Sequence, residues 1–340
     1  MGSSNPNPLV SVVSPYYNRQ EYVYESVQSL LEQTYDNLEI VIVDDGSTDE
    51  TYQRLGSFDD PRLTVIHQEN QGVVGALRTA ISASRGEIVA VHGSGDISYP
   101  ERIEKQVALL QARPEIGVVG CHVENVNTVN GYTKILKSDS RAATTETLKT
   151  KNVFTHGEVM YRRELYERVG GYRFFFRYAE DRDLWLRMRL HTEFDDVEEV
   201  LYRRFLLPNG VGLDLEKSMI QGYLADFAGQ CITYREKYGV DPVDLYGEKA
   251  AFIRRRSPTL ARRLHMLTTA ALVGEDIEQA QRFNDSSRQE ARGVRNTLMQ
   301  GLLGVLASNR YARTSFFRLL PKVRGVKHAR RQRRAELARK

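Results

Sequence analysis

Three aspartates follow apolar stretches of the sequence that are typical of buried β-strands. Asp44 and Asp45 come directly after Leu38–Val43, and Asp96 lies in a glycine-containing loop shortly after Glu87–Val91. In an open α/β sheet, ligands bind at the carboxyl ends of the strands, where such loops meet. Carboxylates at that edge can bind the hydroxyl and N–H groups of a nucleotide or hold a metal ion. Each aspartate alone could equally form a turn or cap a helix, so only their combination indicates a ligand site.

The loop after Val10–Val13 adds Pro15, Tyr17 and Asn18 to the same predicted edge. An aromatic side chain beside carboxylates suits a nucleotide, because the ring can stack on a base. The phosphate-cradling GxxxxGK[ST] motif is absent, which argues against a P-loop nucleotide hydrolase. The loop that contains Asp96 starts like a dinucleotide-binding loop but lacks the third glycine.

These side chains need a sheet that brings the ends of several strands together. The sequence predicts one, because strand patterns alternate with segments of helical periodicity. This alternation is typical of an α/β fold with a mostly parallel sheet, right-handed connections and helices on both faces. The predicted strands are Val10–Val13, Leu38–Val43, Leu63–His67, Glu87–Val91 and Gly117–Val123, and the predicted helices are Tyr22–Gln33, Glu50–Leu55, Val73–Ser84 and Glu101–Ala112.

Composition places the chain among globular proteins. Its 340 residues are 41% hydrophobic and 27% charged, and no apolar run approaches the ~20 residues that span a bilayer. The cysteines, Cys121 and Cys231, have no metal-like spacing and indicate free thiols in a reducing, cytoplasmic compartment. The net charge of +4 conceals a basic end, because Arg318–Lys340 contains ten Lys or Arg and one acid. The rest of the chain is net acidic, which argues against a general polyanion binder.

Several longer motifs together resemble those of a known protein family. From Val10 to Arg204 the sequence resembles the family 2 glycosyltransferases, and the motifs that carry the resemblance are SVVSPYYN, SLLEQTY, EIVIVDDGSTDET, NQG, GEIVA, HGEVMYRR, VGGY, AEDRDLWLRM and VLYRR. The resemblance implies the GT-A fold, which is Rossmann-like. It also implies transfer of a sugar, with inversion, from a nucleotide-diphospho-sugar to a hydroxyl acceptor. The expected role is glycan assembly on a lipid-linked, polysaccharide or glycoconjugate acceptor, protein glycosylation included.

The resemblance also assigns the donor site. Tyr17 and Asp44 are expected to contact the base and the ribose. Asp45 is expected to support this pocket, and Asp96 to lie near the diphosphate. The full set of expected donor-binding residues is Pro15, Tyr17, Asn18, Asp44, Asp45, Gly72, Ser94 and Asp96.

The sequence departs from the family at the metal-binding loop. Family members usually carry several acids there, whereas this chain has Gly93-Ser94-Gly95-Asp96. Asp96 remains as the expected ligand for Mg²⁺ or Mn²⁺, in a weak site, because hard cations prefer several oxygen ligands. The family's histidine after the Tyr-Arg pair is also missing. Metal-independent activity is therefore the second expectation, with the leaving group neutralised by arginines among Arg162, Arg163, Arg203 and Arg204.

The acceptor side of the site is expected around Asp181. By resemblance Asp181 is the general base, and a carboxylate in a partly apolar cleft suits that role because desolvation raises its pKa. His156, Glu180 and Arg203 are expected on the acceptor or diphosphate side. The alternatives are that Asp181 only starts a helix, as Asp183 equally could, and that His156 is structural.

The domain organisation follows from where the family pattern ends. We expect a disordered segment over 1–8, the catalytic domain over 9–212, a helical region over 213–320 and a basic tail over 321–340. Residues 9–100 would form the nucleotide-binding half of the catalytic domain, and residues 101–212 the acceptor half.

Residues 311–340 mix aromatic and basic side chains, which predicts contact with an anionic membrane surface and a peripheral membrane location. A solvated helix with a disordered end is one alternative. Nucleic acid contact is disfavoured because the basic tail over 321–340 has no Phe, Tyr or Trp side chains that could stack on bases. The reduced acid cluster leaves a non-catalytic nucleotide- or partner-binding protein as the alternative function.

Overall fold

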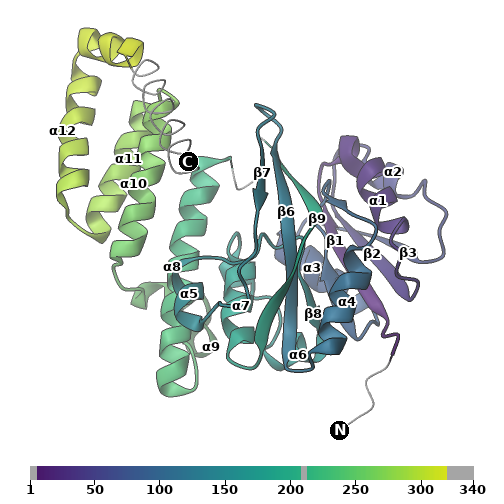
Figure 1. Ribbon diagram of the computed structural model, residues 1–340. Coiled ribbons are helices and arrows are strands. Elements are labelled where there is room, and N and C mark those ends of the chain that lie inside the picture. Colours follow the sequence, from purple (N-terminus) through teal and green to yellow (C-terminus); the bar gives the residue numbers. More distant parts are fainter. Residues whose placement is uncertain (1–5, 208–212, 320–340) are drawn as a thin grey trace, which may run out of the picture. The chain divides into compact units, whose positions relative to one another are not determined.

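The computed structural model describes residues 6–207 and 213–319 and divides into two compact units (Figure 1). Unit 1 contains the residues up to Asp214 together with Leu224–Arg254. Unit 2 contains Leu215–Tyr223 together with the residues from Arg255 onward. The predicted basic tail over 321–340 lies outside the described residues.

Unit 1 is built on a nine-stranded sheet with the order β3-β2-β1-β4-β8-β6-β9-β5, and β7 pairs with β6. The first four strands are parallel to one another, as the strand–helix alternation predicts. The predicted mostly parallel sheet is confirmed. The strands are β1 Val10–Tyr16, β2 Leu38–Asp45, β3 Leu63–Gln68, β4 Ile88–Val91, β5 Ile97–Ser98, β6 Ile116–Asn127, β7 Thr133–Leu136, β8 Met160–Arg162 and β9 Glu193–Leu206.

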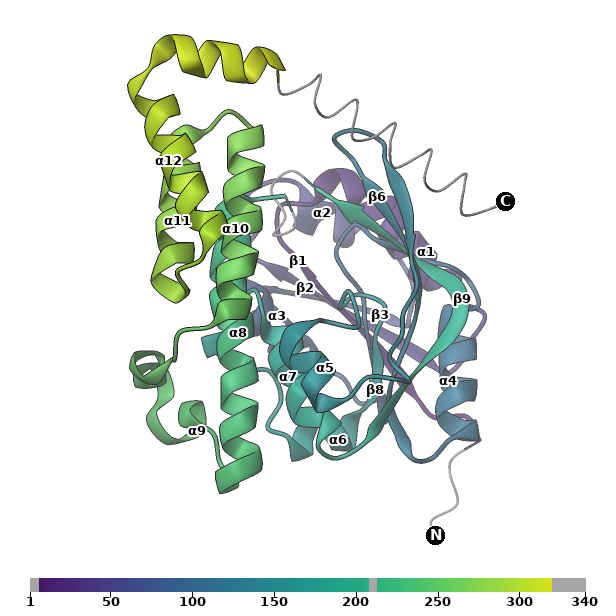
Figure 2. The same cartoon turned by 60° about the vertical axis from the view of Figure 1, so that its left-hand side comes forward.

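Helices cover both faces of this sheet, because alternate side chains of the central strands are apolar on each face. Val13, Val43 and Val91 pack in one core cluster with residues of α3, α5 and α7. Val12 and Ile42 pack in a second cluster with α1 and α4. Figure 2 shows these two groups of helices on opposite sides of the sheet. The helices packed around the sheet are α1 Val23–Leu31, α2 Thr51–Leu55, α3 Gly72–Ala83, α4 Arg102–Ala112, α5 Thr145–Thr150, α6 Arg163–Arg168 and α7 Glu180–Arg189.

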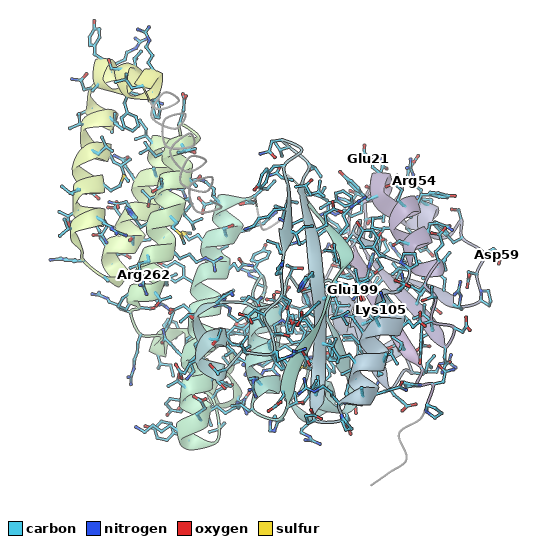
Figure 3. All side chains as sticks on the ribbon, viewed as in Figure 1. Glu21, Arg54, Asp59, Lys105, Glu199 and Arg262 are labelled. Atoms are coloured by element: carbon cyan, nitrogen blue, oxygen red, sulfur yellow. The ribbon has the colours of Figure 1, made fainter. Side chains whose placement is uncertain are left out.

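The second half of the sheet is mixed. β8 pairs antiparallel with both β4 and β6, whereas the long β9 runs parallel to β6. β9 also pairs antiparallel with β5, the short strand that follows the loop of Asp96. Lys105 of α4 and Glu199 of β9, 2.7 Å apart, form an ion pair on the outer surface of this half (Figure 3). The C-terminal end of β9 therefore lies against the β4–β5 loop.

A buried ion network extends unit 1 beyond the predicted boundary at residue 213. Arg173 binds Asp183 of α7 and, at 2.9 Å, Asp241, the residue that caps α9 (Pro242–Tyr246). Arg235 of α8 (Leu215–Tyr238) reaches the same Asp241 at 2.8 Å. The second part of α8 also buries Phe227 and neighbouring side chains in the core that contains α7. These contacts place 224–254 in unit 1, which local sequence periodicity could not reveal.

Unit 2 is helical, as expected. Its core joins apolar residues of α10, α11 and α12, Leu272, Phe283 and Leu303 among them. Ser257 and Asp276 cap the first turns of α10 and α11. The helices are α10 Pro258–Val273, α11 Ile277–Glu290 and α12 Val294–Ser308.

None of the helices within 6–207 and 213–319 is long and apolar enough to cross a membrane. Of the segment expected to be disordered, residues 6–8 are described. The carbonyl oxygens of Asn7 and Pro8 accept hydrogen bonds of 2.7 Å from Asn37 and Tyr35, so these residues lie against the sheet domain.

Candidate active site

Strand register brings the first group of predicted residues to one edge of the sheet. Tyr16 lies opposite Asp44, and Asp44 lies opposite His67 on β3. The adjacent strand β4 ends at Val91, just before the loop of Asp96. The loops after β1, β2 and β4 therefore leave the sheet at the same edge, as the sequence predicts.

Asp44 is fully buried at this edge. Its Oδ2 atom accepts a hydrogen bond of 2.7 Å from Nδ1 of His67, and its Oδ1 atom has no protein partner within the described chain. The His67 ring packs on Tyr52 with 4.7 Å between ring centroids. The exposed rings of Tyr52 and Tyr17 are available for stacking. A buried carboxylate oxygen without a donor is costly, so this atom is poised to bind an N–H or O–H group of a ligand.

Asp45 and Asn18 organise the loops around Asp44. Oδ1 of Asp45 accepts hydrogen bonds from Gln68 Nε2 (2.7 Å) and from the backbone N–H of Gln71 (2.9 Å). This fixes the turn before Gly72, which has a positive φ of 75°. Asn18 Oδ1 accepts from the N–H of Thr48 at 2.8 Å, which ties the β1 loop to the β2 loop. Pro15 lies within β1, next to Tyr16.

Asp96 is almost completely buried, and both of its oxygens are engaged. Oδ2 accepts a hydrogen bond from the Tyr202 hydroxyl (2.8 Å), and Oδ1 accepts one from the backbone N–H of Phe205 (2.9 Å). Burial raises the pKa of Asp96 to about 6, although the Phe205 N–H and the charge of Arg204 oppose this. Ser94, on the same loop, is half-buried. Asp96 thus anchors the end of β9 to the β4–β5 loop.

The residues around Asp96 do not fit a divalent cation held by several protein ligands. Glu158, whose charge also raises the pKa of Asp96, is buried and uses both oxygens to accept hydrogen bonds from Thr155. No group of three or more metal-ligating side chains occurs in the described part of the chain. One carboxylate that already accepts two hydrogen bonds is a poor donor set for Mg²⁺ or Mn²⁺. The metal site expected at Asp96 is therefore not supported by its surroundings.

Asp181 lies in the first turn of α7 and is partly exposed. Its Oδ2 atom accepts a hydrogen bond from Asn152 Nδ2 (2.5 Å), and its Oδ1 atom accepts one from the N–H of Arg182 (2.7 Å). Beside it, Glu180 is buried with an Oε2 atom that has no partner among the described residues. Burial, together with the charge of Asp181, raises the pKa of Glu180 to about 8.

His156 lies between the two acidic regions. Its Nε2 atom is 2.8 Å from the Tyr172 hydroxyl, its ring meets Trp185 edge-on, and its φ of 87° is strained for a residue with a side chain. Burial lowers the pKa of His156, Asp181 raises it and Arg204 lowers it further. The adjacent Gly157 packs against the loop after β4, since a Cβ atom added there would lie 3.2 Å from the backbone nitrogen of Gly93.

Arg203 does not join this group. Its Nε atom donates to Glu124 at 2.5 Å, on the face of β9 opposite Tyr202, because successive strand residues point to opposite faces. Arg203 is expected from the sequence on the acceptor or diphosphate side, and the structure pairs it with Glu124 instead. Sequence reasoning also missed His67, Asn152 and the bond between Tyr202 and Asp96, since each depends on a pairing of distant segments that leaves no local pattern.

Comparisons with known proteins agree with this geometry. The model of the family described as "Glycosyl transferase family 2" matches residues 11–170. The putative glycosyltransferase EpsE of Bacillus subtilis is 34% identical over 191 residues, which is 54% of this chain and 67% of that protein. The chondroitin synthase of Escherichia coli is 28% identical over 223 residues, covering 63% of this chain and 31% of that protein. An uncharacterized glycosyltransferase of Rickettsia typhi is 29% identical, and the match covers 66% of it. The chain thus spans about two thirds of the length of the first and third of these relatives.

Two solved structures show the same fold. Staphylococcus aureus TarS 1–349, in complex with UDP, superposes with a TM-score of 0.54 at 18% identity, covering 83% of this chain and 91% of that one. The mannosyltransferase PcManGT of Pyrobaculum calidifontis, in complex with GDP-Man and Mn²⁺, superposes with a TM-score of 0.53 at 20% identity, covering 90% and 82%. Each match extends over most of both chains.

Proposed function

The chain belongs to glycosyltransferase family 2, and from this premise we propose that it transfers a sugar from a nucleotide-diphospho-sugar to a hydroxyl acceptor with inversion. The protein is a glycosyltransferase, and its relatives include enzymes of glycan assembly. The alternative of a non-catalytic binding protein receives no support from these relatives.

On the donor side, Asp44 binds an N–H or hydroxyl group of the nucleoside, with Tyr17 stacking on the base. The proposal is supported by the buried Oδ1 atom of Asp44, which has no donor in the described chain. His67 holds the other oxygen, so the carboxylate is oriented before the nucleotide arrives. Asp45, Asn18 and Gly72 shape the surrounding loops without themselves needing to touch the donor.

On the acceptor side, Asp181 is the general base. It takes the proton of the acceptor hydroxyl while that oxygen forms a bond to the anomeric carbon. The bond from this carbon to the diphosphate breaks on the opposite face, and its electron pair leaves with the diphosphate. Asn152 and the N–H of Arg182 keep Asp181 oriented. Glu180 and His156 lie alongside, where they can contact the acceptor.

One geometric observation carries the proposal: a Cβ atom added at Gly157 would lie 3.2 Å from the backbone nitrogen of Gly93, so the segment of His156 packs against the loop after β4. The His156 ring in turn packs edge-on against Trp185 of α7. This packing supports a single site formed by the loop after β4 and the N-terminus of α7, which are more than eighty residues apart in sequence. A nucleotide sugar between them would present its diphosphate near Asp96 and its anomeric carbon toward Asp181.

The experiment is release of nucleoside diphosphate from a panel of UDP-, GDP- and dTDP-sugars by the purified full chain, with simple sugars as trial acceptors. Release from one donor class, enhanced by an acceptor, supports the proposal and identifies the base and sugar. Failure of every donor to bind, measured separately by calorimetry, would contradict it.

We further propose that unit 2 binds an anionic membrane surface, where a lipid-linked acceptor would be found. Val294, Leu298 and Val305 are 77%, 70% and 53% exposed and share one face of α12, since they are spaced by about whole helical turns. Beyond α12, a cavity of about 720 Å³ is lined by Arg310, Arg313 and Arg318, among others. Glu275 lines the same cavity, but the three arginines outnumber it, and apolar side chains beside net positive charge suit anionic lipid headgroups.

Sedimentation with vesicles tests this surface. Binding to phosphatidylglycerol vesicles that exceeds binding to phosphatidylcholine vesicles, and that weakens in Leu298→Gln and in Arg313→Ala, is expected. Equal binding to both kinds of vesicle, or to neither, would contradict it.

A further inference from the structure

A further acid in the loop after β4 would require Asp96 or Tyr22 to move. A Cβ atom added at Gly93 would lie 2.4 Å from Oδ2 of Asp96, and one added at Gly95 would lie 2.9 Å from Cβ of Tyr22. Such distances are too short for non-bonded atoms. Asp96 itself is occupied by Tyr202 and Phe205. In this arrangement the loop therefore has no acid other than Asp96 that could hold a cation against a bound diphosphate.

Most arginines of this region are already used by the protein. Arg102 donates to Ser98 and to the carbonyl of Val91, both at 2.8 Å. Arg162 donates to the carbonyls of Leu110 and Ile116, and Arg163 to those of Ile81 and Gly86. Arg203 is paired with Glu124. These side chains would lose existing bonds if they turned to a ligand.

Arg204 is different. It is half-buried, and within the described chain its guanidinium has neither a hydrogen-bond acceptor nor an acid partner. Alternation along β9 places it on the same face as Tyr202, the face of Asp96. Its charge reaches both Asp96 and His156. A half-buried guanidinium without a partner is a ready binding site for an anion.

We propose that Arg204 binds the diphosphate of the nucleotide-sugar donor and neutralises the charge of the leaving group, in place of a divalent cation. The proposal rests on the proposed function and specifies how its donor site works. As the bond between the anomeric carbon and the diphosphate oxygen breaks, the departing electron pair adds negative charge to the diphosphate. A guanidinium fixed at that position stabilises this charge more in the transition state than in the bound donor. Asp96 acts as a positioning residue, because its bond to the N–H of Phe205 fixes the backbone of β9 next to Arg204.

The test measures binding by titration calorimetry on the full chain, with UDP and GDP as charged probes and uridine and guanosine as uncharged ones. Each titration is run with EDTA and again with Mn²⁺. The variants are Arg204→Ala and Arg204→Lys. Arg262→Ala is the matched control, because Arg262 is an exposed arginine of α10 in unit 2 (Figure 3).

With EDTA present, the wild type is expected to bind the preferred diphosphate with a dissociation constant within about twofold of that measured with Mn²⁺. Arg204→Ala should weaken this binding about 10- to 100-fold, the loss typical of one charged hydrogen-bonding group. Binding of the matching nucleoside should not change, and Arg204→Lys should restore part of the affinity. Arg262→Ala should behave as wild type.

Three results would overturn the proposal. If Mn²⁺ is needed for the wild type to bind a diphosphate, a metal ion neutralises the charge of the diphosphate. Only this inference then fails, while the proposed function stands. If Arg204→Ala binds the diphosphate as well as wild type does, Arg204 has another role. If neither UDP nor GDP binds under any condition, the inference and the proposed function both fail.

Discussion

The hydroxyl of Tyr202 donates a hydrogen bond to Oδ2 of Asp96 and accepts one from the N–H of Gly93, each 2.8 Å long. One side chain of β9 thus satisfies a carboxylate and an amide of the β4–β5 loop. The Arg102 guanidinium covers the Tyr202 ring, with 4.9 Å between its central carbon and the ring centroid. This hydroxyl therefore joins the last long strand of the sheet to the loop after β4.

Tyr202→Phe should therefore destabilise the protein. The change leaves Asp96 Oδ2 and the Gly93 N–H without their partner, and a buried group of this kind costs about 1–3 kcal/mol. Urea titration should show this loss in the free energy of unfolding. Tyr132→Phe is the control, because Tyr132 is 64% exposed and should show no loss. Equal stability of the two variants would mean that water replaces the Tyr202 hydroxyl at no cost.

Asp181→Asn should abolish the base and leave donor binding intact. Loss of general base catalysis lowers turnover by on the order of 10²–10⁴, while the dissociation constant for the donor should stay within about twofold of wild type. Initial rates of nucleoside diphosphate release, together with calorimetry, separate the two quantities. Asp59→Asn provides a matched change at an exposed acid remote from the site (Figure 3). Unchanged turnover in Asp181→Asn would mean that another group takes the proton of the acceptor hydroxyl.

Glu180 predicts how stability depends on pH. Its pKa is about 8 in the folded protein because of burial, against an ordinary value of 4.5. The folded chain therefore binds a proton that the unfolded chain releases between these values, so the free energy of unfolding falls as the pH rises toward 8. We expect a fall on the order of 1–3 kcal/mol between pH 6.5 and 8.5 in wild type, and a smaller one in Glu180→Gln.

Urea titrations across that pH range provide the measurement for Glu180. In the upper part of this pH range Asp96, whose pKa is about 6, is already mostly ionised, so it contributes little to the change in the free energy of unfolding. Glu21→Gln changes an exposed acid in the short 3₁₀ helix before α1 and should keep the wild-type slope (Figure 3). If Glu180→Gln also keeps that slope, the carboxyl group is not the origin of the pH dependence.

Arg173→Met should be strongly destabilising. It removes the cation that the buried carboxylates of Asp183 and Asp241 share, so that Asp183 keeps only Arg187 and Asp241 keeps only Arg235 as an ion-pair partner. Breaking a buried ion pair from one side costs about 3–5 kcal/mol. Denaturation should report this as a lower free energy of unfolding, and Arg177→Met, at an exposed arginine nearby, should leave it unchanged. A loss below 1 kcal/mol would mean that Arg187 and Arg235 suffice to hold both acids.

The first half of the sheet could be predicted from the sequence because its signals are local. Apolar runs such as Leu38–Val43 identify strands by themselves, and the acids that follow them mark the ligand edge. The mixed half could not be predicted in the same way. β8 has three residues, and the pairing of β9 with both β5 and β6 joins segments far apart in the chain. Strand pairing of this kind depends on tertiary packing.

The same distinction applies to the site. Asp44, Asp96 and Asp181 could be proposed from their place after strands or in a recognisable motif. Their partners could not, because the bonds from His67, Tyr202 and Asn152 each come from another element. The role proposed for Arg204 illustrates the limit most clearly. Its sequence neighbour Arg203 carries the same charge, and only the alternation of β9 with the position of Glu124 separates the two.

The packing of Tyr202 between Gly93 and Gly157 restricts which side chains these two positions accept. A side chain at Gly157 would place its Cβ atom 2.3 Å from the Tyr202 hydroxyl, just as one at Gly93 would meet Asp96. An acid introduced at residue 93 would therefore require the Asp96 side chain to move, and with it the hydrogen bond from the Tyr202 hydroxyl. For sequence design this means that positions 93, 96, 157 and 202 have to be chosen together.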